Sequence, residues 1–542
     1  MNGYRHRHLT RRSFVAGAVG AAAGAALLGG GGATAAPRRS AGSAHAAQAS
    51  AADLFAQLDE KILSGLQRFA IPGAAVAVFH QGREYVKGYG VTNVAAPTPV
   101  DGKTLFRIGS TSKTLTGTTA MVLVDRGRLQ LDRRVRHYLP GFRPPRGAGS
   151  VTVRQLLNHS AGWLGYDYHD TGRGDNALGT YAHDMRKLPQ LTPVGRIFSY
   201  NNAAIALAGR VIEKVTDMPF EDAVAKYMLR AIGMSSTFYF SDEIIGHSIA
   251  AGHGVVNGAA QVDPSLWYLP REANPYGGAI SSVADQLRWA RFHLGDGRGA
   301  RGRRVMSPRA LRAMRRRPGP GGTLLVELDG FGVSWMIRPS AQGVRIIEHG
   351  GDVPGQHSGF FFVPDRNFAM TLLTNSEAGP SLVEELFFDD WALSRFAGLS
   401  NLPATPQQLD AKALAPYEGR YTAEQIGITG PPVELIVHMR ASDGGLLMEE
   451  EETVGTGKQR EHTPAGKYLL RFYKRDYILA YQPSGAPIYL RANFLRDRSG
   501  RISFFRFGGM LFRRRSRGQR LPRRPNMTAR APGSRSTPSA PG

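Results

Sequence analysis

The stretch that organises this chain of 542 residues reads Phe106-Arg-Ile-Gly-Ser-Thr-Ser-Lys-Thr-Leu-Thr-Gly-Thr-Thr-Ala-Met-Val-Leu-Val-Asp-Arg-Gly127. Its apolar spacing predicts a helix that stops at Gly127, and on a helix Ser110 and Lys113 share one face. A lysine whose proton affinity is lowered by its surroundings can deprotonate a serine hydroxyl and make it a nucleophile. Taken alone, the pattern also fits a helix-capping serine beside a solvated lysine.

A second candidate segment contains Tyr200-Asn-Asn202, directly before an apolar pattern typical of a helix. A tyrosine oxygen near Ser110 and Lys113 can relay protons between the nucleophile and the leaving group. The amide of Asn202 can bind a substrate carbonyl. The alternative is an asparagine that caps the following helix, with Tyr200 packed in the core.

A third candidate lies at the end of a predicted strand, where residues 344–348 run into His349-Gly-Gly-Asp352. Two successive glycines allow a backbone to approach a ligand closely. The next residues predict two more strands, 359–363 and 368–374, joined by a turn. Earlier in the chain, residues 54–69 predict an amphipathic helix, and residues 74–91 predict a strand pair.

The composition limits the function classes. Lys and Arg outnumber Asp and Glu by 68 to 43, which gives a formal charge of +25, and no cysteine is present. The lack of cysteine excludes disulfides and thiolate metal sites. We find no other metal-ligand spacing and expect neither a metal nor a cofactor. No module of aromatic and basic residues is evident, so we expect no nucleic-acid partner.

The two ends of the chain do not read as folded domains. Residues 1–50 combine Thr10-Arg-Arg-Ser-Phe14 with an Ala/Gly-rich run, which predicts a twin-arginine-type signal peptide and leader. We therefore expect an exported protein, secreted or in the cell envelope, without a stable transmembrane span after cleavage. An uncleaved anchor is the alternative. Residues 513–542 are rich in Arg and contain no acid, which predicts a basic disordered tail.

An arginine cluster between Arg301 and Arg317 has two interpretations. It can contact an anionic cell-envelope polymer or lipid headgroup, or it can be a solvated helix face. After residue 400, short strand-like segments at regular spacing predict a small antiparallel barrel over 405–512.

With its three candidate segments in this order, the chain resembles the serine β-lactamase and penicillin-binding-protein superfamily, in particular its class C branch. Ser110-Thr-Ser-Lys113 and Tyr200-Asn-Asn202 match the first two motifs, and His349-Gly-Gly351 takes the place of the third, Lys-Thr-Gly. The resemblance covers residues 51–400. It implies an α+β fold, with an antiparallel sheet flanked by helices beside an all-helical region. The predicted barrel resembles the lipocalin-like domain often appended to this family.

The resemblance also implies roles for these residues. Ser110 would be acylated, with Lys113 and Tyr200 as base and acid. Asn202, His349 and Gly351 would bind the substrate. The backbone N–H groups of Ser110 and Asp352 would hold the oxyanion.

The expected function is an exported serine hydrolase that cleaves an ester or amide of a small molecule or peptide. An esterase or peptidase is favoured, because a β-lactamase uses the third-motif lysine to hold a carboxylate, and histidine is largely neutral near pH 7. One alternative is a β-lactamase or D,D-carboxypeptidase acting on β-lactams or peptidoglycan peptides. Another is a catalytically silent binding protein that uses the same cleft.

Overall fold

The computed structural model describes residues 51–316, 318–426, 433–454 and 461–515. The predicted leader, residues 1–50, and residues 516–542 of the predicted tail lie outside the described residues. Export and tail disorder therefore stay predictions. In the part of the chain that is described, we find no helix with the length and apolar character needed to cross a membrane.

An eight-stranded antiparallel sheet forms the centre of the first region. Along its path the strand order is β10-β11-β12-β14-β15-β1-β2, and β13 pairs separately with β14. The strands are β1 (Gly73–His80), β2 (Arg83–Gly90), β10 (Gly330–Phe331), β11 (Met336–Pro339), β12 (Arg345–Glu348), β13 (Gly351–Val353), β14 (Gln356–Val363) and β15 (Phe368–Thr374). The hairpins predicted from the sequence are the pairs β1–β2 and β14–β15.

The two faces of this sheet contribute to different cores, as strand alternation requires. On β1, Ala74, Val76 and Val78 belong to one hydrophobic cluster, and Ala75 and Ala77 belong to another. The first cluster includes the apolar face of the amphipathic helix α2 (Ala51–Arg68) and the C-terminal helical turns. Those turns are α13 (Gly379–Val383), η10 (Glu384–Phe388) and η11 (Leu393–Ala397).

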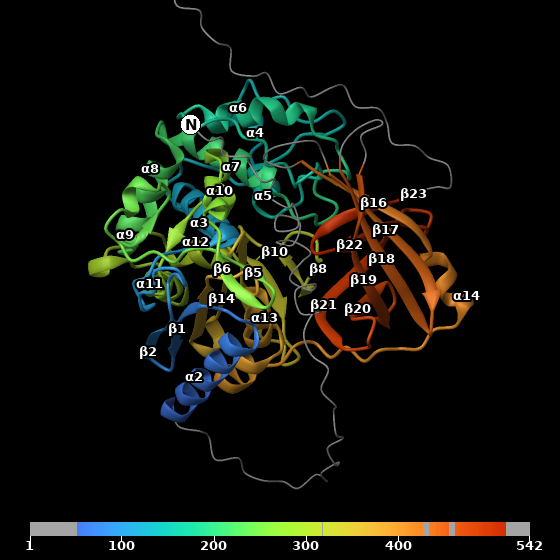
Figure 1. Cartoon of the computed structure of the whole chain (residues 1–542). Helices are drawn as coiled ribbons and strands as arrows, with labels where there is room; N and C mark the ends of the chain where they lie inside the picture. Colours follow the sequence, from blue (N-terminus) through green and yellow to red (C-terminus); the bar gives the residue numbers. More distant parts are fainter. Residues whose placement is uncertain (1–50, 317, 427–432, 455–460, 516–542) are drawn as a thin grey trace, which may run out of the picture.

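The second cluster joins the sheet to the helical region (Figure 1). The helices of this side are α3 (Ser112–Asp125), α4 (Val135–Tyr138), α5 (Val153–Leu157), α6 (Ala177–Asp184), α7 (Asn202–Thr216), α8 (Phe220–Val224), α9 (Arg230–Ile232), α10 (Asn274–Gly277), α11 (Val283–Leu294) and α12 (Pro308–Ala313). Short pairings complete it: β3 (Phe106–Arg107), β4 (Thr237–Phe238) and β7 (Ile280–Ser281); β5 (His253–Val256) with β6 (Ala259–Val262); and β8 (Gly322–Leu324) with β9 (Val326–Leu328). Helix α3 is buried along nearly its whole length, so it forms the axis of this region.

A closed antiparallel barrel of eight strands lies beside this region (Figure 1, orange to red). Its strands are β16 (Gly419–Gln425), β17 (Val433–Ser442), β18 (Gly445–Val454), β19 (Glu461–Lys474), β20 (Tyr477–Tyr481), β21 (Pro487–Arg496), β22 (Ile502–Phe507) and β23 (Met510–Arg515). A short helix, α14 (Ala411–Leu414), precedes the first strand. Buried aromatic side chains, among them Tyr421, Phe494 and Phe505, fill the barrel core.

One predicted boundary is wrong by three residues. Arg513, Arg514 and Arg515 were assigned to the tail because of their charge, but they form the end of β23. Arg513 pairs with Thr422, and Arg515 pairs with Arg420, so these residues close the barrel by joining β23 to β16. Closure satisfies the backbone groups of both edge strands, and this outweighs the low strand tendency of consecutive charges. The predicted fold class, an α+β β-lactamase-like region followed by an antiparallel barrel, is confirmed.

Candidate active site

Ser110 lies in a single 3-10 turn, η2 (Gly109–Thr111), which leads directly into α3. The turn packs closely on β13. A Cβ atom at Gly109 would lie 2.7 Å from the backbone N of Asp352, and one at Gly351 would lie 2.7 Å from the backbone N of Ser110. Glycine at both positions lets the two backbones touch. The two peptide groups expected to hold the oxyanion therefore lie next to each other.

Lys113 lies one helical turn after Ser110 and is completely buried. Its Nζ is 2.7 Å from Ser110 Oγ and 2.7 Å from the carbonyl oxygen of Tyr276. Burial lowers the pKa of Lys113 well below its usual range, although the Asp352 carboxylate opposes this shift. An amine that gives up its proton at moderate pH and contacts a hydroxyl is a suitable base for that hydroxyl.

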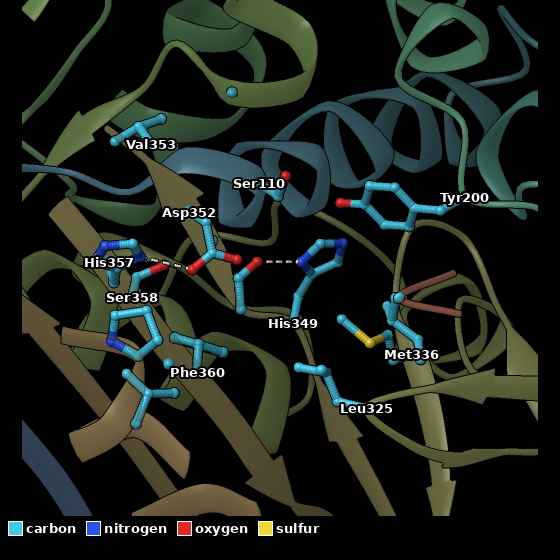
Figure 2. A pocket seen from close by; sticks show the side chains of 18 of the residues that line it. Ser110, Tyr200, Leu325, Met336, His349, Asp352, Val353, His357, Ser358 and Phe360 are labelled. Atoms are coloured by element: carbon cyan, nitrogen blue, oxygen red, sulfur yellow. Dashed lines mark hydrogen bonds and ion pairs between the residues drawn. The ribbon is translucent and has the colours of Figure 1, made fainter. Parts of the chain in front are cut away.

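Tyr200 reaches the same point from the opposite side, in the extended segment before α7 (Figure 2). Its ring lies 4.9 Å from Lys113 Nζ and stacks on His159, with ring centroids 4.6 Å apart. Burial raises the pKa of Tyr200, and a hydrogen bond with Ser110 partly offsets this rise. Ser110, Lys113 and Tyr200 thus meet in one place.

The two asparagines after Tyr200 make different contacts. Asn201 is the helix cap: its Oδ1 accepts from the N–H of Ala204 at 2.8 Å, and its Nδ2 donates to the carbonyl of Trp163. Asn202 faces the cavity, where its Nδ2 donates to Tyr168 Oη at 2.8 Å. Its Oδ1 is buried and has no hydrogen-bond partner among the described residues. The capping role considered for this motif therefore belongs to Asn201.

His349 follows the end of β12 and also faces the cavity. Its Nδ1 is 2.6 Å from the carbonyl oxygen of Gly350, while its Nε2 is buried without a partner among the described residues. Burial, assisted by the nearby Lys113, lowers the pKa of His349 to about 3. The ring is therefore neutral at physiological pH and cannot provide a positive charge.

A cavity of about 160 Å³ connects these side chains. Ser110, Tyr200, Asn202, His349 and Gly351 all line it, and Lys113 lies behind Ser110. Its walls are mainly apolar, with Leu325, Met336, Phe360, Val383, Phe387 and Phe388. Neither lysine nor arginine is among the residues that line it.

Sequence reasoning missed several residues of this cavity. Tyr168, which holds Asn202, and Tyr276, whose carbonyl holds Lys113, have no motif spacing that marks them. His159 is a third residue without a predicted role. Its Nδ1 accepts the N–H of Asn201 at 2.9 Å and its ring supports Tyr200. For Asp352, the sequence predicts a role for the backbone N–H and none for the carboxylate.

The barrel reaches the cavity as well. The turn between β22 and β23 places Gly508 in the cavity wall, and the carbonyl of Gly509 accepts the N–H of Tyr200 at 2.9 Å. The buried Arg506 donates to the carbonyl of Phe198 through Nη2 at 2.8 Å and Nε at 3.1 Å. The segment that carries Tyr200 is therefore bonded to the C-terminal barrel.

Comparisons with known proteins agree with this architecture. The family model described as Beta-lactamase matches residues 51–391. Penicillin-binding protein 4 of Amycolatopsis lactamdurans is 32% identical over 361 residues, which cover 65% of this chain and 94% of that protein. The crystal structure of SurE is 27% identical and superposes with a TM-score of 0.66 over 86% of this chain and all of that one. A structure of SurE with D-Leu is 26% identical, with a TM-score of 0.62 over 85% of this chain and 99% of that one. By sequence and by fold, the chain belongs to the beta-lactamase family of serine hydrolases.

Proposed function

We propose that this protein is a serine hydrolase that cleaves an ester or an amide through an acyl-enzyme on Ser110. The observation that carries the proposal is the 2.7 Å contact between Lys113 Nζ and Ser110 Oγ in a fully buried environment that lowers the pKa of the amine. A binding protein without catalysis has no need for a buried lysine whose charge is so strongly disfavoured.

The geometry supports an ordered sequence of proton transfers. Lys113, assisted by the Tyr200 hydroxyl, accepts the Ser110 proton as Oγ attacks the substrate carbonyl. The negative oxygen of the tetrahedral intermediate is held by the N–H groups of Ser110 and Asp352. The same proton then passes to the leaving oxygen or nitrogen, and the bond to the leaving group breaks. A water molecule repeats the sequence on the acyl-enzyme and releases the acid.

The surroundings of His349 favour an esterase or peptidase over a β-lactamase. A neutral imidazole replaces the third-motif lysine, and neither lysine nor arginine lines the cavity, so a substrate carboxylate has no lysine or arginine to bind. SurE, a relative with the same overall fold, has been solved with D-Leu. Amino-acid esters and amides should therefore be tested as substrates beside simple esters.

An activity-based fluorophosphonate probe tests the proposal. We expect labelling of the native protein, no labelling of Ser110→Ala, and full labelling of Ser64→Ala, a matched serine change on the exposed surface of α2. No labelling of the native protein would support the silent binding alternative. The same three proteins are then assayed with a short-chain nitrophenyl ester and a chromogenic cephalosporin. Faster turnover of the cephalosporin would support the β-lactamase alternative.

We also propose export by the twin-arginine pattern at Arg11 and Arg12. Replacing both arginines by lysine should retain the protein inside the cell, and cell fractionation measures this. Unchanged export of the double variant would contradict the proposal. The suggested contact of the cluster from Arg301 to Arg317 with an anionic envelope polymer stays a prediction.

A further inference from the structure

The carboxylate of Asp352 occupies a central position in the cavity (Figure 2). Asp352 is the middle residue of β13, and its side chain is 39% exposed while both neighbours are buried. Its own backbone N–H is one of the two groups expected to hold the oxyanion. The carboxylate therefore belongs to the same residue as a group that would contact the reacting carbonyl of the substrate.

The contact of this carboxylate with His357 uses only one of its two oxygens. Asp352 Oδ1 lies 2.7 Å from His357 Nδ1, across the β13–β14 pair. The imidazole is only 3% exposed, and its Nε2 has no partner among the described residues. The ring can donate from Nδ1 to Asp352 Oδ1 with or without a second proton, so the contact occupies one of the two carboxylate oxygens. No hydrogen bond occupies Asp352 Oδ2 within the described part of the chain, so this oxygen can accept one from a ligand.

Burial weakens the positive charge that Lys113 and His349 could place near this carboxylate. The pKa of Lys113 is lowered well below its usual range, and that of His349 is lowered to about 3. Of the other two carboxyl groups in the wall, Glu348 is paired with Arg338 at 3.1 Å. The second, Glu384, has its pKa raised to about 8 by burial and by Asp352 itself, so it is largely protonated at neutral pH. Of the three carboxyl groups in the wall, Asp352 is thus the one most available to a positively charged ligand.

Two other polar groups of the cavity, on Asn202 and Tyr276, also favour a ligand that forms hydrogen bonds with them. The Nδ2 of Asn202 donates to Tyr168. The acceptor Oδ1 of Asn202 therefore remains without a partner among the described residues. The hydroxyl of Tyr276 lines the same cavity and is likewise buried without a partner in the described residues. Buried polar atoms without partners are costly unless a ligand satisfies them.

We propose that Asp352 selects substrates with a positively charged amino group next to the scissile carbonyl. The preferred class is then an α-aminoacyl ester or amide with a free amino terminus, whose ammonium group binds Asp352 Oδ2. The inference rests on the proposed acyl-enzyme chemistry at Ser110 and adds the substrate class to it.

The test uses three alanine nitroanilides, in both stereochemical forms, that differ only at the amino group: free, acetylated and succinylated. For the native protein we expect kcat/KM to fall in the order cationic, neutral, anionic. In Asp352→Asn, the ratio of cationic to neutral kcat/KM should fall by at least about tenfold, as expected for losing a hydrogen bond to a charged group. Asp352→Glu should retain a preference for the cation, and Asp132→Asn, an exposed acid elsewhere, should keep the native ratio.

Rates of Ser110 labelling give the same comparison without any turnover. Two alkyl fluorophosphonates are used, one with a terminal ammonium group and one with a neutral end of equal size. We expect the ammonium probe to label the native protein faster, and Asp352→Asn to remove this advantage. If both probes label Ser110 but the ratio is equal in the native protein and in Asp352→Asn, the proposed specificity is wrong while the acyl-enzyme chemistry stands. If neither probe labels Ser110, the proposed function itself is wrong, and this inference falls with it.

Discussion

The two segments that carry the proposed catalytic groups differ in what holds them in place. The Ser110–Lys113 segment is fixed from within the β-lactamase-like region. Ser112 Oγ donates to the carbonyl of Gly109 and accepts the N–H of Ala279, and Lys113 donates to Tyr276. All of these partners lie on η2 or in and beside α10.

The Tyr200 segment is held by its own region, through His159, and also by the barrel, whose Arg506 lies 308 residues after Phe198. Arg506 on β22 donates twice to the carbonyl of Phe198, and the Gly509 carbonyl accepts the N–H of Tyr200. Arg506 is itself held, since its Nη1 donates to Asn493 Oδ1 at 3.0 Å. Burial lowers the pKa of Arg506 to about 10, so it stays charged at neutral pH.

Among the described residues, the barrel thus forms hydrogen bonds with the Tyr200 segment, whereas the hydrogen bonds named for the Ser110–Lys113 segment stay within its own region. A guanidinium group offers a fixed, planar set of donors, which suits it to orienting a backbone carbonyl. The barrel therefore helps to position Tyr200, one of the three side chains of the proposed mechanism. Changes on the two sides of the cleft should have distinct effects.

The largest effect is expected on the internal side of the cleft, from Lys113→Met. The apolar replacement suits the buried position but cannot accept the Ser110 proton, so kcat should fall by roughly 10²–10⁴-fold. Ester hydrolysis and probe labelling measure the loss, and Lys103→Met, an exposed lysine before the same segment, is the control. A fall in kcat of less than tenfold would indicate that another group acts as the base.

The pH dependence of kcat/KM also tests whether Lys113 acts as the base. The base works only after losing its proton, so kcat/KM of the native protein should rise with pH through the lowered pKa of Lys113 and then level off. In Lys113→Met this acidic limb should disappear. His349 should contribute a limb only near pH 3, because its pKa is about 3.

A smaller effect is expected from the barrel side, in Arg506→Met. Without the two bonds to Phe198, Tyr200 loses part of its positioning, and kcat should fall by about tenfold while KM changes little, since a misplacement near 1 Å can cost more than this. Arg506→Lys should recover part of kcat, because it restores one donor. Arg513→Met, which removes another barrel contact, from Arg513 Nη2 to the carbonyl of Leu191, is the control.

The number of active sites separates positioning from general damage, because a loss of folded protein also lowers the apparent kcat without changing KM. We therefore express kcat per active site, counted by the total extent of fluorophosphonate labelling. If the fall in kcat of Arg506→Met disappears after this correction, the arginine is structural only. If kcat is unchanged, the Tyr200 segment does not depend on the barrel, and the contrast between the two sides of the cleft disappears.

The sequence allowed much of the internal side to be predicted. The helix after Ser110, the strand pair β14–β15 and the strand that ends before His349 each follow from local spacing or from turn residues. Ser110 and Lys113 stand close because three residues on a helix bring them together. The meeting with Tyr200 was implied by the family resemblance alone, and the structure places it there.

The barrel side could not be predicted in the same way. In the run Ile502–Phe507, Arg506 has nothing to distinguish it from any charged residue of a strand. Its role arises when the barrel packs on a loop about three hundred residues earlier, and local patterns carry no information on such packing. The choice between Asn201 and Asn202 as helix cap was equally open, because either residue type can cap and only the backbone path decides.

The smallest effect on catalysis is expected from Glu327→Gln, at another contact between the barrel and the first region. Glu327 on β9 accepts from Tyr473 Oη at 2.9 Å, Lys474 Nζ at 2.5 Å and Arg491 Nη1 at 3.2 Å, all on the barrel. Removing its charge should lower the free energy of unfolding by about 1 kcal/mol, as for other partly exposed ion pairs. Denaturant unfolding measures this, and kcat should stay native, because Glu327 contacts neither Tyr200 nor Phe198. If kcat falls as far as in Arg506→Met, the barrel acts through its docking as a whole, and the specific path from Arg506 to Tyr200 is wrong.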